Sequence, residues 1–187
     1  MNEYLTKFTE AKGDSYAFDL RLRHAWCVKY AWSVPSTEAL ETIAALGPVV
    51  EIGAGAGYWA YLLREMGVDV LAYDVTPPTA ASKANHWHAE TNTWTEVLQG
   101  NTDEAAKHPE RTLFLCWPPY DTAMGVWALK AYKGNTVVYI GEDAWGCTGD
   151  KDFHEMLAAE WIETKHVRLP QYGGIHDSMT VYTRKSV

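Results

Sequence analysis

Hydrophobic and polar positions follow two patterns along this chain, one typical of helices and one typical of strands. Apolar residues between Ala39 and Leu46 recur three and four positions apart, which predicts a helix. Ser36 is placed to be its N-cap, and Gly47-Pro48 ends it. Later segments combine short apolar runs, which predict buried strands, with further helix-spaced stretches. The predicted strands are 49–52, 69–73, 93–99 (the weakest), 112–116, 136–140, 162–169 and 179–183, and the predicted helices are 58–66, 122–131 and 153–161, with one or two more in the first 30 residues.

Strands and helices alternate from residue 48 onward. This order predicts an α/β fold, in which a doubly wound, mostly parallel sheet is covered by helices on both faces. The last two predicted strands follow each other closely and would form an antiparallel pair at one edge. Ligands of such sheets bind beyond the carboxyl ends of the strands. We therefore predict one domain over 1–187, with a helical cap over 1–47 and a cofactor-binding core over 48–187.

The composition narrows the classes of partner. The chain has 187 residues, of which 47% are apolar and 21% are charged, and this balance suits a single folded domain. Its net charge is −8, and it contains no long cluster of Lys and Arg. Binding of duplex DNA depends on many such phosphate contacts, so the charge argues against a duplex partner. A short or single-stranded nucleic acid is still compatible with the sequence.

Apolar runs, cysteines and aromatic residues indicate the cellular compartment and the nature of the core. No segment reaches about 18 consecutive apolar residues, and the first residues do not resemble a secretory signal, so we expect no membrane span. Cys27, Cys116 and Cys147 are too scattered for a disulfide framework or a zinc site, which favours a reducing cytoplasm. Nine Trp and eleven Tyr predict either an aromatic core or stacking walls around a flat ligand.

A glycine-rich loop joins the first predicted strand to the next helix. Gly53, Gly55 and Gly57 alternate with small residues, which lets the backbone turn tightly and approach a ligand closely. The helix that follows presents free N–H groups at its start. Asp74 ends the next strand about 20 residues later, where a carboxylate can accept hydrogen bonds from both ribose hydroxyls of a nucleoside. The nicotinamide fingerprint requires a small residue where this chain has Tyr58, which argues against that cofactor.

The segment from Glu51 to Gly57, Glu-x-Gly-x-Gly-x-Gly, resembles the first motif of class I S-adenosylmethionine-dependent methyltransferases. The resemblance extends from Pro48 to about Tyr182 and implies a Rossmann-like, seven-stranded sheet with a reversed final hairpin. It also implies S-adenosylmethionine as cofactor. By position in the family, Glu51 would hold the amino end, directly or through water, and the loop residues Gly53, Ala54, Gly55 and Gly57 would line the middle of the cofactor. Asp74 and Val75 would lie at the ribose and Asn101, or else Asp103, at the adenine, while Tyr58, Trp59 and Trp117 would pack against the cofactor, although Trp59 could equally be core.

A second motif, Trp117-Pro118-Pro119-Tyr120, follows the predicted strand 112–116. It resembles the Asp/Asn/Ser-Pro-Pro-aromatic motif of methyltransferases that act on exocyclic amines of adenine or cytosine, or on glutamine. This implies that Trp117, Pro118, Pro119 and Tyr120 form the catalytic loop, with Tyr120 stacking on a planar acceptor. The chain departs from that family at Trp117, because an indole N–H only donates and cannot accept a proton from an amine. Backbone carbonyls of Trp117 and Pro118 are left as acceptors, and a rigid turn without chemistry is the alternative.

Three further segments carry weaker signals. The loop 141–150 contains three glycines and is a candidate lid, in which Glu142 or Asp143 could contact the substrate. Trp32 precedes the first core helix and could close over the site or pack beneath it. His86-Trp87-His88 would place two imidazoles on one face, but no third ligand is near in the sequence, so we expect no metal site. His176-Asp177 could supply a general base or lie in a solvated turn.

The sequence thus predicts a methyltransferase that uses direct in-line transfer from S-adenosylmethionine. Such transfer depends on positioning and exclusion of water, so the lack of a catalytic triad is no objection. The expected acceptor is a nitrogen on a small molecule, a protein side chain or an unpaired nucleotide. The alternatives are a non-catalytic protein that binds the cofactor as a sensor or partner subunit and, third, a nicotinamide-dependent oxidoreductase. The acceptor itself and the oligomeric state stay open.

Overall fold

The computed structural model describes residues 2–12, 20–78, 87–88, 93–144 and 146–186 of the chain. The helices are α1 (Glu3–Lys12), α2 (Leu20–Lys29), α3 (Thr37–Ala44), α4 (Tyr58–Glu65), α5 (Met124–Ala131) and α6 (Lys151–Glu160), with a 3₁₀ helix, η1 (Thr102–Lys107). The strands are β1 (Val49–Ile52), β2 (Val70–Asp74), β3 (Leu98–Gln99), β4 (Thr112–Cys116), β5 (Thr136–Gly141), β6 (Trp161–Arg168) and β7 (Ser178–Arg184). Within those ranges, no helix is long and apolar enough to span a membrane.

The strands form one seven-stranded sheet in the order β3-β2-β1-β4-β5-β7-β6. Neighbouring strands from β3 to β5 pair in parallel, and β7 is antiparallel to both β5 and β6. The predicted α/β fold, with its mostly parallel sheet and its antiparallel C-terminal strands, is therefore confirmed. The direction of winding reverses between β1 and β4, and in sheets of this kind such a point opens a crevice for a ligand.

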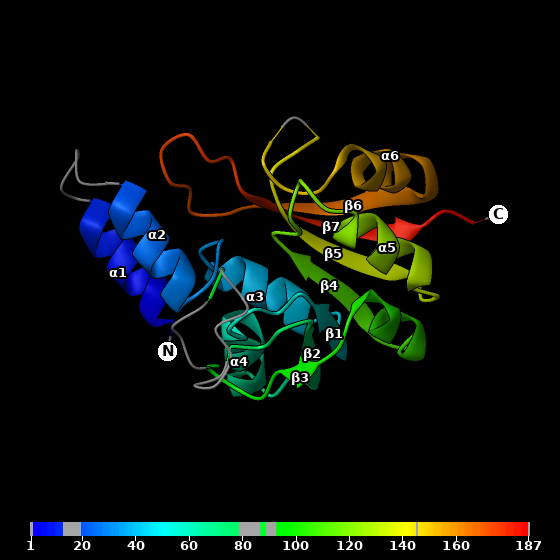
Figure 1. Cartoon of the computed structure of the whole chain (residues 1–187), viewed down its shortest axis with the longest axis horizontal. Helices are drawn as coiled ribbons and strands as arrows, with labels where there is room; N and C mark the ends of the chain where they lie inside the picture. Colours follow the sequence, from blue (N-terminus) through cyan, green and yellow to red (C-terminus); the bar gives the residue numbers. More distant parts are fainter. Residues whose placement is uncertain (1, 13–19, 79–86, 89–92, 145, 187) are drawn as a thin grey trace.

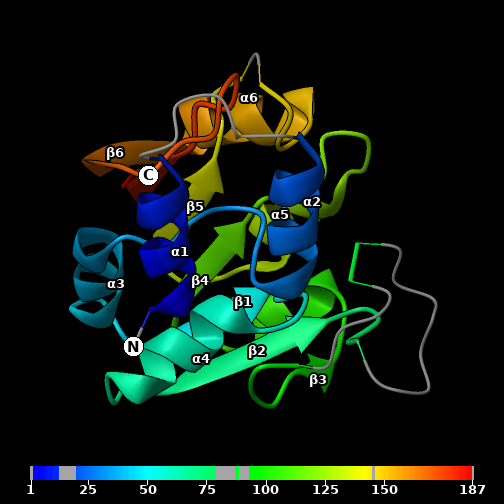
Figure 2. The ribbon, with the colours of Figure 1, turned by 90° about the vertical axis from the view of Figure 1, so that its left-hand side faces the viewer.

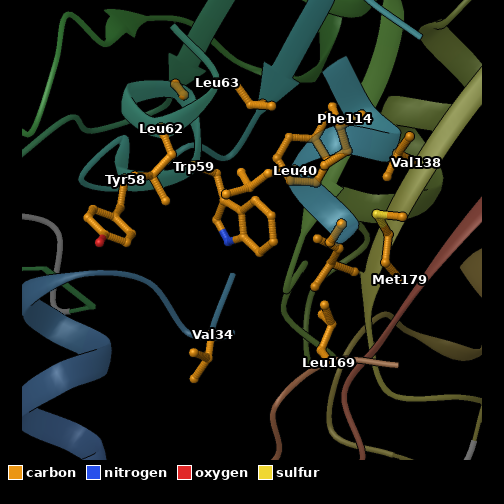
Figure 3. Packing of buried hydrophobic residues seen from close by; sticks show 14 of the residues in the cluster. Val34, Leu40, Tyr58, Trp59, Leu62, Leu63, Phe114, Val138, Leu169 and Met179 are labelled. Atoms are coloured by element: carbon orange, nitrogen blue, oxygen red, sulfur yellow. The ribbon is translucent and has the colours of Figure 1, made fainter. Parts of the chain in front are cut away.

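Alternate residues of the central strands face opposite layers of helices. Val49 and Phe114 pack with α3 and α4, whereas Val50 and Leu113 pack with α5 and α6. The strands are buried on both faces, as expected where helices cover both sides of a parallel sheet. Figure 1 shows the two layers, and Figure 3 shows Trp59 of α4 packed close to Phe114.

The first two helices lie beyond the carboxyl ends of the parallel strands, at the left of Figure 1 and in front of the sheet in Figure 2. Tyr4 of α1 stacks on Tyr30 with 4.8 Å between ring centroids, and both rings contact Tyr58 at the start of α4. The Tyr4 backbone N–H also donates to the Tyr58 hydroxyl at 3.1 Å. These contacts fix the N-terminal helices over the edge of the sheet where the ligand crevice opens.

Local signals set the ends of the elements. Ser36 is the N-cap of α3, as predicted, since its hydroxyl accepts a hydrogen bond from the Ala39 N–H at 3.1 Å. The predicted strand 93–99 is wrong in length, because only Leu98 and Gln99 pair with β2. The segment before Leu98 contacts the glycine loop instead, because the Trp94 N–H donates to the Ala56 carbonyl at 2.8 Å.

Candidate functional site

A cavity of about 700 Å³ lies at the carboxyl ends of β1, β2 and β4. This volume is within the range of pockets that bind cofactors and small molecules. Five of the residues that line it are Trp or Tyr, so part of the aromatic content does form walls around a pocket. The lining consists of Arg23, Trp32, Ile52, Gly53, Gly55, Asp74, Val75, Thr76, Trp87, His88, Gly100, Asn101, Thr102, Cys116, Trp117, Pro118, Pro119, Tyr120, Asp121, Thr122, Met124, Trp127 and Cys147.

The glycine loop forms one wall of this cavity. Gly53, Gly55 and Gly57 have φ angles of 78°, 54° and 74°, which residues with a side chain rarely adopt. The N–H groups of Gly53 and Ala54 donate to the Tyr73 carbonyl at 2.8 and 2.9 Å, which ties the loop to the end of β2. A Cβ on Gly53 would stand 2.6 Å from the Met124 methyl group, so that flexible side chain would have to move, and the φ of 78° would still be strained.

We expect Gly55→Ala to abolish ligand binding in the cavity, whereas Gly67→Ala should leave binding intact at a similar backbone cost. A Cβ there would collide with the His88 imidazole and displace one or the other into the cavity. Gly67→Ala is the matched control, because Gly67 has a φ of 83° but no atom within 4 Å of its Cβ position. Both variants should lose about 1–2 kcal/mol to the left-handed backbone in urea unfolding. Equal ligand affinities for the two variants would contradict this account of the loop.

Asp74 sits at the end of β2 and is 7% exposed. Its carboxylate accepts hydrogen bonds from the Gly55 N–H and the Thr76 N–H, both at 2.9 Å, so the acid is oriented by the loop that it serves. Val75 and Asn101 line the cavity beside it. The Asn101 amide oxygen accepts from the Asp103 N–H at 2.9 Å, which caps η1 and leaves Asp103 outside the lining.

Glu51 is buried in β1 and does not belong to the cavity lining. Its Oε2 atom has no hydrogen-bond partner among the described residues. Burial raises the pKa of Glu51 to about 8, an effect that the Arg64 charge opposes and the Asp74 charge reinforces. A buried carboxylate with an unsatisfied oxygen is suited to accept a hydrogen bond from a bound cation or ordered water.

Four other residues expected at the cofactor lie behind the wall rather than on it. Ala54, Gly57, Tyr58 and Trp59 are absent from the lining. Tyr58 is 1% exposed within the tyrosine cluster of the N-terminal helices, and Trp59 packs edge-on against Phe114 with 5.6 Å between ring centroids. Their contacts are those of core residues that support the loop.

The second motif forms the opposite wall, and its first residue is held in an unusual conformation. Trp117 has a φ of 54°, which is rare for a residue with a side chain. Its indole N–H donates to Asp177 Oδ1 at 2.8 Å, and its ring stacks on Trp32 with 5.5 Å between centroids. Trp32 therefore lines the cavity, which is the first of the two positions considered for it. Backbone strain of this kind is found mostly at functional sites.

The Pro118 carbonyl already has a partner. It accepts a hydrogen bond from the Gly149 N–H at 2.7 Å, and Pro119 forms an isolated bridge with Thr148. The second motif is thus fastened to the loop after β5, and one of the two lone pairs of the Pro118 carbonyl is used by that contact. Tyr120 is 60% exposed, so its ring is free to stack on a ligand at the mouth of the cavity.

Asp177 is 1% exposed, so it does not lie in a solvated turn. Burial raises its pKa to about 7, against the lowering effects of the Trp117 hydrogen bond and the Arg23 charge.

We expect Asp177→Ala to be less stable than Asp177→Asn by about 1–3 kcal/mol, because only alanine leaves the Trp117 indole N–H without its acceptor. Urea unfolding of both variants measures this difference, and equal stabilities would show that the hydrogen bond does not hold Trp117.

The acids of the candidate lid have different surroundings. The Glu142 carboxylate accepts hydrogen bonds from the Cys147 N–H at 2.8 Å, the Cys147 thiol at 2.9 Å and the His176 N–H at 2.8 Å. Burial alone would raise the pKa of Glu142, but these bonds outweigh it and lower the pKa. Glu142 therefore serves to fix the loop, and neither Glu142 nor the exposed Asp143 lines the cavity.

The two thiols in the cavity wall are not activated. Burial raises the pKa of Cys116 well above its usual value, and burial with the nearby Glu142 raises that of Cys147 to about 12. Both are therefore protonated at neutral pH, and a thiolate is the form that reacts as a nucleophile.

Sequence reasoning missed several residues of the lining. Arg23, His88, Met124 and Trp127 reach the cavity from α2, the segment after β2 and α5. His88 was considered only as a metal ligand, and His86 lies outside the described residues. Trp127 offered one signal, since it is a large aromatic residue that is 58% exposed on a helix following the second motif.

Comparisons with known proteins bear on the fold. The sequence matches no protein-family model and no curated protein sequence. Among solved structures, magnesium protoporphyrin IX methyltransferase from Synechocystis PCC 6803, with bound S-adenosylmethionine, is similar with a TM-score of 0.52 and 11% identity, over 89% of this chain and 82% of that one. The fold is that of S-adenosylmethionine-dependent methyltransferases.

Two further methyltransferases show the same likeness. The 1,6-didemethyltoxoflavin-N1-methyltransferase of Burkholderia thailandensis, with bound S-adenosylhomocysteine, has a TM-score of 0.51 and 14% identity, over 98% of this chain and 86% of that one. An O-methyltransferase from neocarzinostatin biosynthesis has a TM-score of 0.55 and 17% identity, over 91% of this chain and 57% of that one. The methyltransferase fold therefore occurs with both nitrogen and oxygen acceptors, and these identities establish the fold alone.

Proposed function

We propose that this protein is an S-adenosylmethionine-dependent methyltransferase whose cofactor and acceptor share the cavity described above. One observation carries the proposal: the glycine loop, Asp74 and the Trp117–Tyr120 loop, which are far apart in the sequence, all line the same cavity of about 700 Å³. The methyltransferase fold supports it.

The residues present fit such a cofactor. Gly53 and Gly55 have positive φ angles that favour glycine, and a Cβ at Gly55 would also collide with the His88 imidazole. The orphaned Oε2 of Glu51 is a buried acceptor for the positively charged amino end, reached directly or through water. Asp74 would hold the ribose with Val75 beside it, and Asn101 would contact the adenine.

S-adenosylmethionine supplies an activated methyl group on a sulfonium, so the chain need only position an acceptor and keep water out. The rings of Trp32, Trp87 and Trp117 line the cavity and give it an apolar wall. The hydrogen bond from Trp117 to Asp177 and the fastening of Pro118 to Gly149 hold the catalytic loop before an acceptor arrives. This arrangement reduces the freedom that binding must otherwise remove.

Within the proposed reaction, we expect the acceptor to be a nitrogen on a planar group, stacked on Tyr120. The exposed ring of Tyr120 at the cavity supports this assignment. The small molecule, the protein side chain and the unpaired nucleotide are all compatible with the cavity, and the net charge of −8 disfavours duplex DNA.

A methyl-transfer assay tests the proposal. Purified protein with radiolabelled S-adenosylmethionine is offered aromatic amines, amino-substituted nucleosides and glutamine peptides, next to phenols and carboxylic acids. We expect label on an amine and none with Asp74→Ala. Label on oxygen acceptors alone would overturn the nitrogen assignment. Tight binding of the cofactor with no transfer to any acceptor would instead support the non-catalytic sensor or partner subunit.

A further inference from the structure

One arginine of the cavity wall has two nitrogen atoms that no described residue pairs by a hydrogen bond. Arg23, on α2, lines the cavity, and its Nε and Nη2 atoms are buried without a hydrogen-bond partner among the described residues. Other arginines of the chain are used by the fold: Arg64 donates to the carbonyls of Glu96 and Val70, and Arg184 donates to the carbonyls of Gly134 and Tyr132. Buried donors are nearly always paired, so unpaired ones call for an explanation.

Three aromatic rings surround the guanidinium of Arg23 and leave its N–H groups as the part that can bind an acceptor. Its guanidinium carbon lies 5.1 Å from the ring centroid of Trp117 and 5.5 Å from those of Trp32 and Tyr172. Contacts of this kind attract the cation and displace water from it. They satisfy its charge in part, but they offer no acceptor for the N–H groups in the plane of the guanidinium.

The two unpaired atoms lie on the same edge of the guanidinium. Nε–H and one N–H of Nη2 point in the same direction, and this pair matches the two oxygens of a carboxylate. Asp177, an acid whose pKa the Arg23 charge lowers, already accepts a hydrogen bond from Trp117. A carboxylate from outside the chain would pair with the two buried donors that the described residues leave unpaired.

We propose that Arg23 is a carboxylate-binding residue of the cavity, gripping a bound molecule through Nε and Nη2. This inference rests on the proposed function for one of its two possible sources, the carboxylate of the cofactor's methionine portion. The other source is a carboxylate on the acceptor itself. Both present the same planar, charged fork, and the geometry of Arg23 is suited to that shape rather than to a neutral group.

Calorimetry with two pairs of probes tests this inference. The first pair is S-adenosylhomocysteine and its decarboxylated analogue, which differ only in the carboxylate. The second pair is benzoate and benzamide, titrated into protein saturated with S-adenosylhomocysteine. The proteins are the wild type, Arg23→Gln, Arg23→Lys as a variant that keeps the charge but loses the fork, and Lys130→Gln. Lys130 is exposed on α5 and does not line the cavity. Lys130→Gln removes one positive charge, as Arg23→Gln does, and therefore controls for the change in charge.

We expect the wild type to prefer the carboxylate member of one pair by about 10- to 100-fold. Arg23→Gln should lose this preference, Arg23→Lys should keep only part of it, and Lys130→Gln should retain it in full. A preference in the first pair assigns the cofactor carboxylate, and one in the second pair assigns an acceptor carboxylate. If folded Arg23→Gln binds all four probes as the wild type does, the inference is wrong.

The proposed function can fail independently. Wild-type protein that binds neither S-adenosylhomocysteine nor its analogue would refute the cofactor assignment, and benzoate and benzamide added alone would still test Arg23. Wild-type protein that binds S-adenosylhomocysteine without any effect of the Arg23 substitutions would leave the cofactor assignment intact and refute the carboxylate site.

Discussion

Replacing Asp74 by alanine should weaken binding of S-adenosylhomocysteine by 100-fold or more. The carboxylate of Asp74 is expected to accept hydrogen bonds from both ribose hydroxyls. Each hydrogen bond to a charged group contributes about 1.5–3 kcal/mol, so the loss of two amounts to a factor on the order of 10² to 10⁴. The same carboxylate orients the Gly55 and Thr76 N–H groups, and loosening of the loop adds to the effect. Isothermal titration of the wild type and Asp74→Ala measures the difference.

A second acid provides the control for charge. Asp152 is exposed in the first turn of α6 and does not line the cavity. Asp152→Ala removes the same charge and should bind as the wild type does. If Asp74→Ala also binds within threefold of the wild type while remaining folded, Asp74 does not hold the nucleoside.

Replacing Glu51 by glutamine should remove a large part of the pH dependence of stability. The pKa of Glu51 is about 8 in the folded protein and near 4.3 in an unfolded chain. Between these values the unfolded chain releases a proton that the folded protein retains, so the free energy of unfolding falls as pH rises from about 4.5 to 8. At about 1.36 kcal/mol per pKa unit, the loss attributable to Glu51 is on the order of 5 kcal/mol, and Glu51→Gln should lack it.

Urea unfolding at pH 5 and pH 8.5 tests this expectation without any ligand. The wild type should lose stability between the two values, partly through Asp177, whose pKa is also raised by burial. Glu51→Gln should lose markedly less, and it should also bind S-adenosylhomocysteine more weakly, because the amide cannot lose a proton and become an anion when the positively charged amino end binds. A pH dependence that is unchanged in Glu51→Gln would mean that the carboxyl is not buried uncharged.

The sheet and the first wall of the site could be predicted because their signals are local. The apolar run of β4 is found at the residues predicted, and the spacing from Gly53 to Asp74 places both at the ends of adjacent strands. The weak strand near residue 95 failed because its β-forming residues sit at an exposed edge, where pairing is decided by contacts from other segments.

The second wall depends on contacts that the sequence does not display. The hydrogen bond from Trp117 to Asp177 joins residues 60 positions apart, and Arg23 reaches the same place from α2. Glu142 was expected at the substrate because it follows a strand, but loop backbone N–H groups take up its oxygens. Side-chain partners of this kind follow from packing in three dimensions, whereas strand ends and glycine turns follow from the order of residues.

The central claim is that the cavity holds S-adenosylmethionine, and one titration tests it most directly. Wild-type protein is titrated in the calorimeter with S-adenosylhomocysteine and, separately, with NADH. The account predicts micromolar binding of S-adenosylhomocysteine at one molecule per chain and no heat with NADH. Binding of NADH alone, or of neither ligand, would contradict it, because the glycine loop and Asp74 would then serve another cofactor or none.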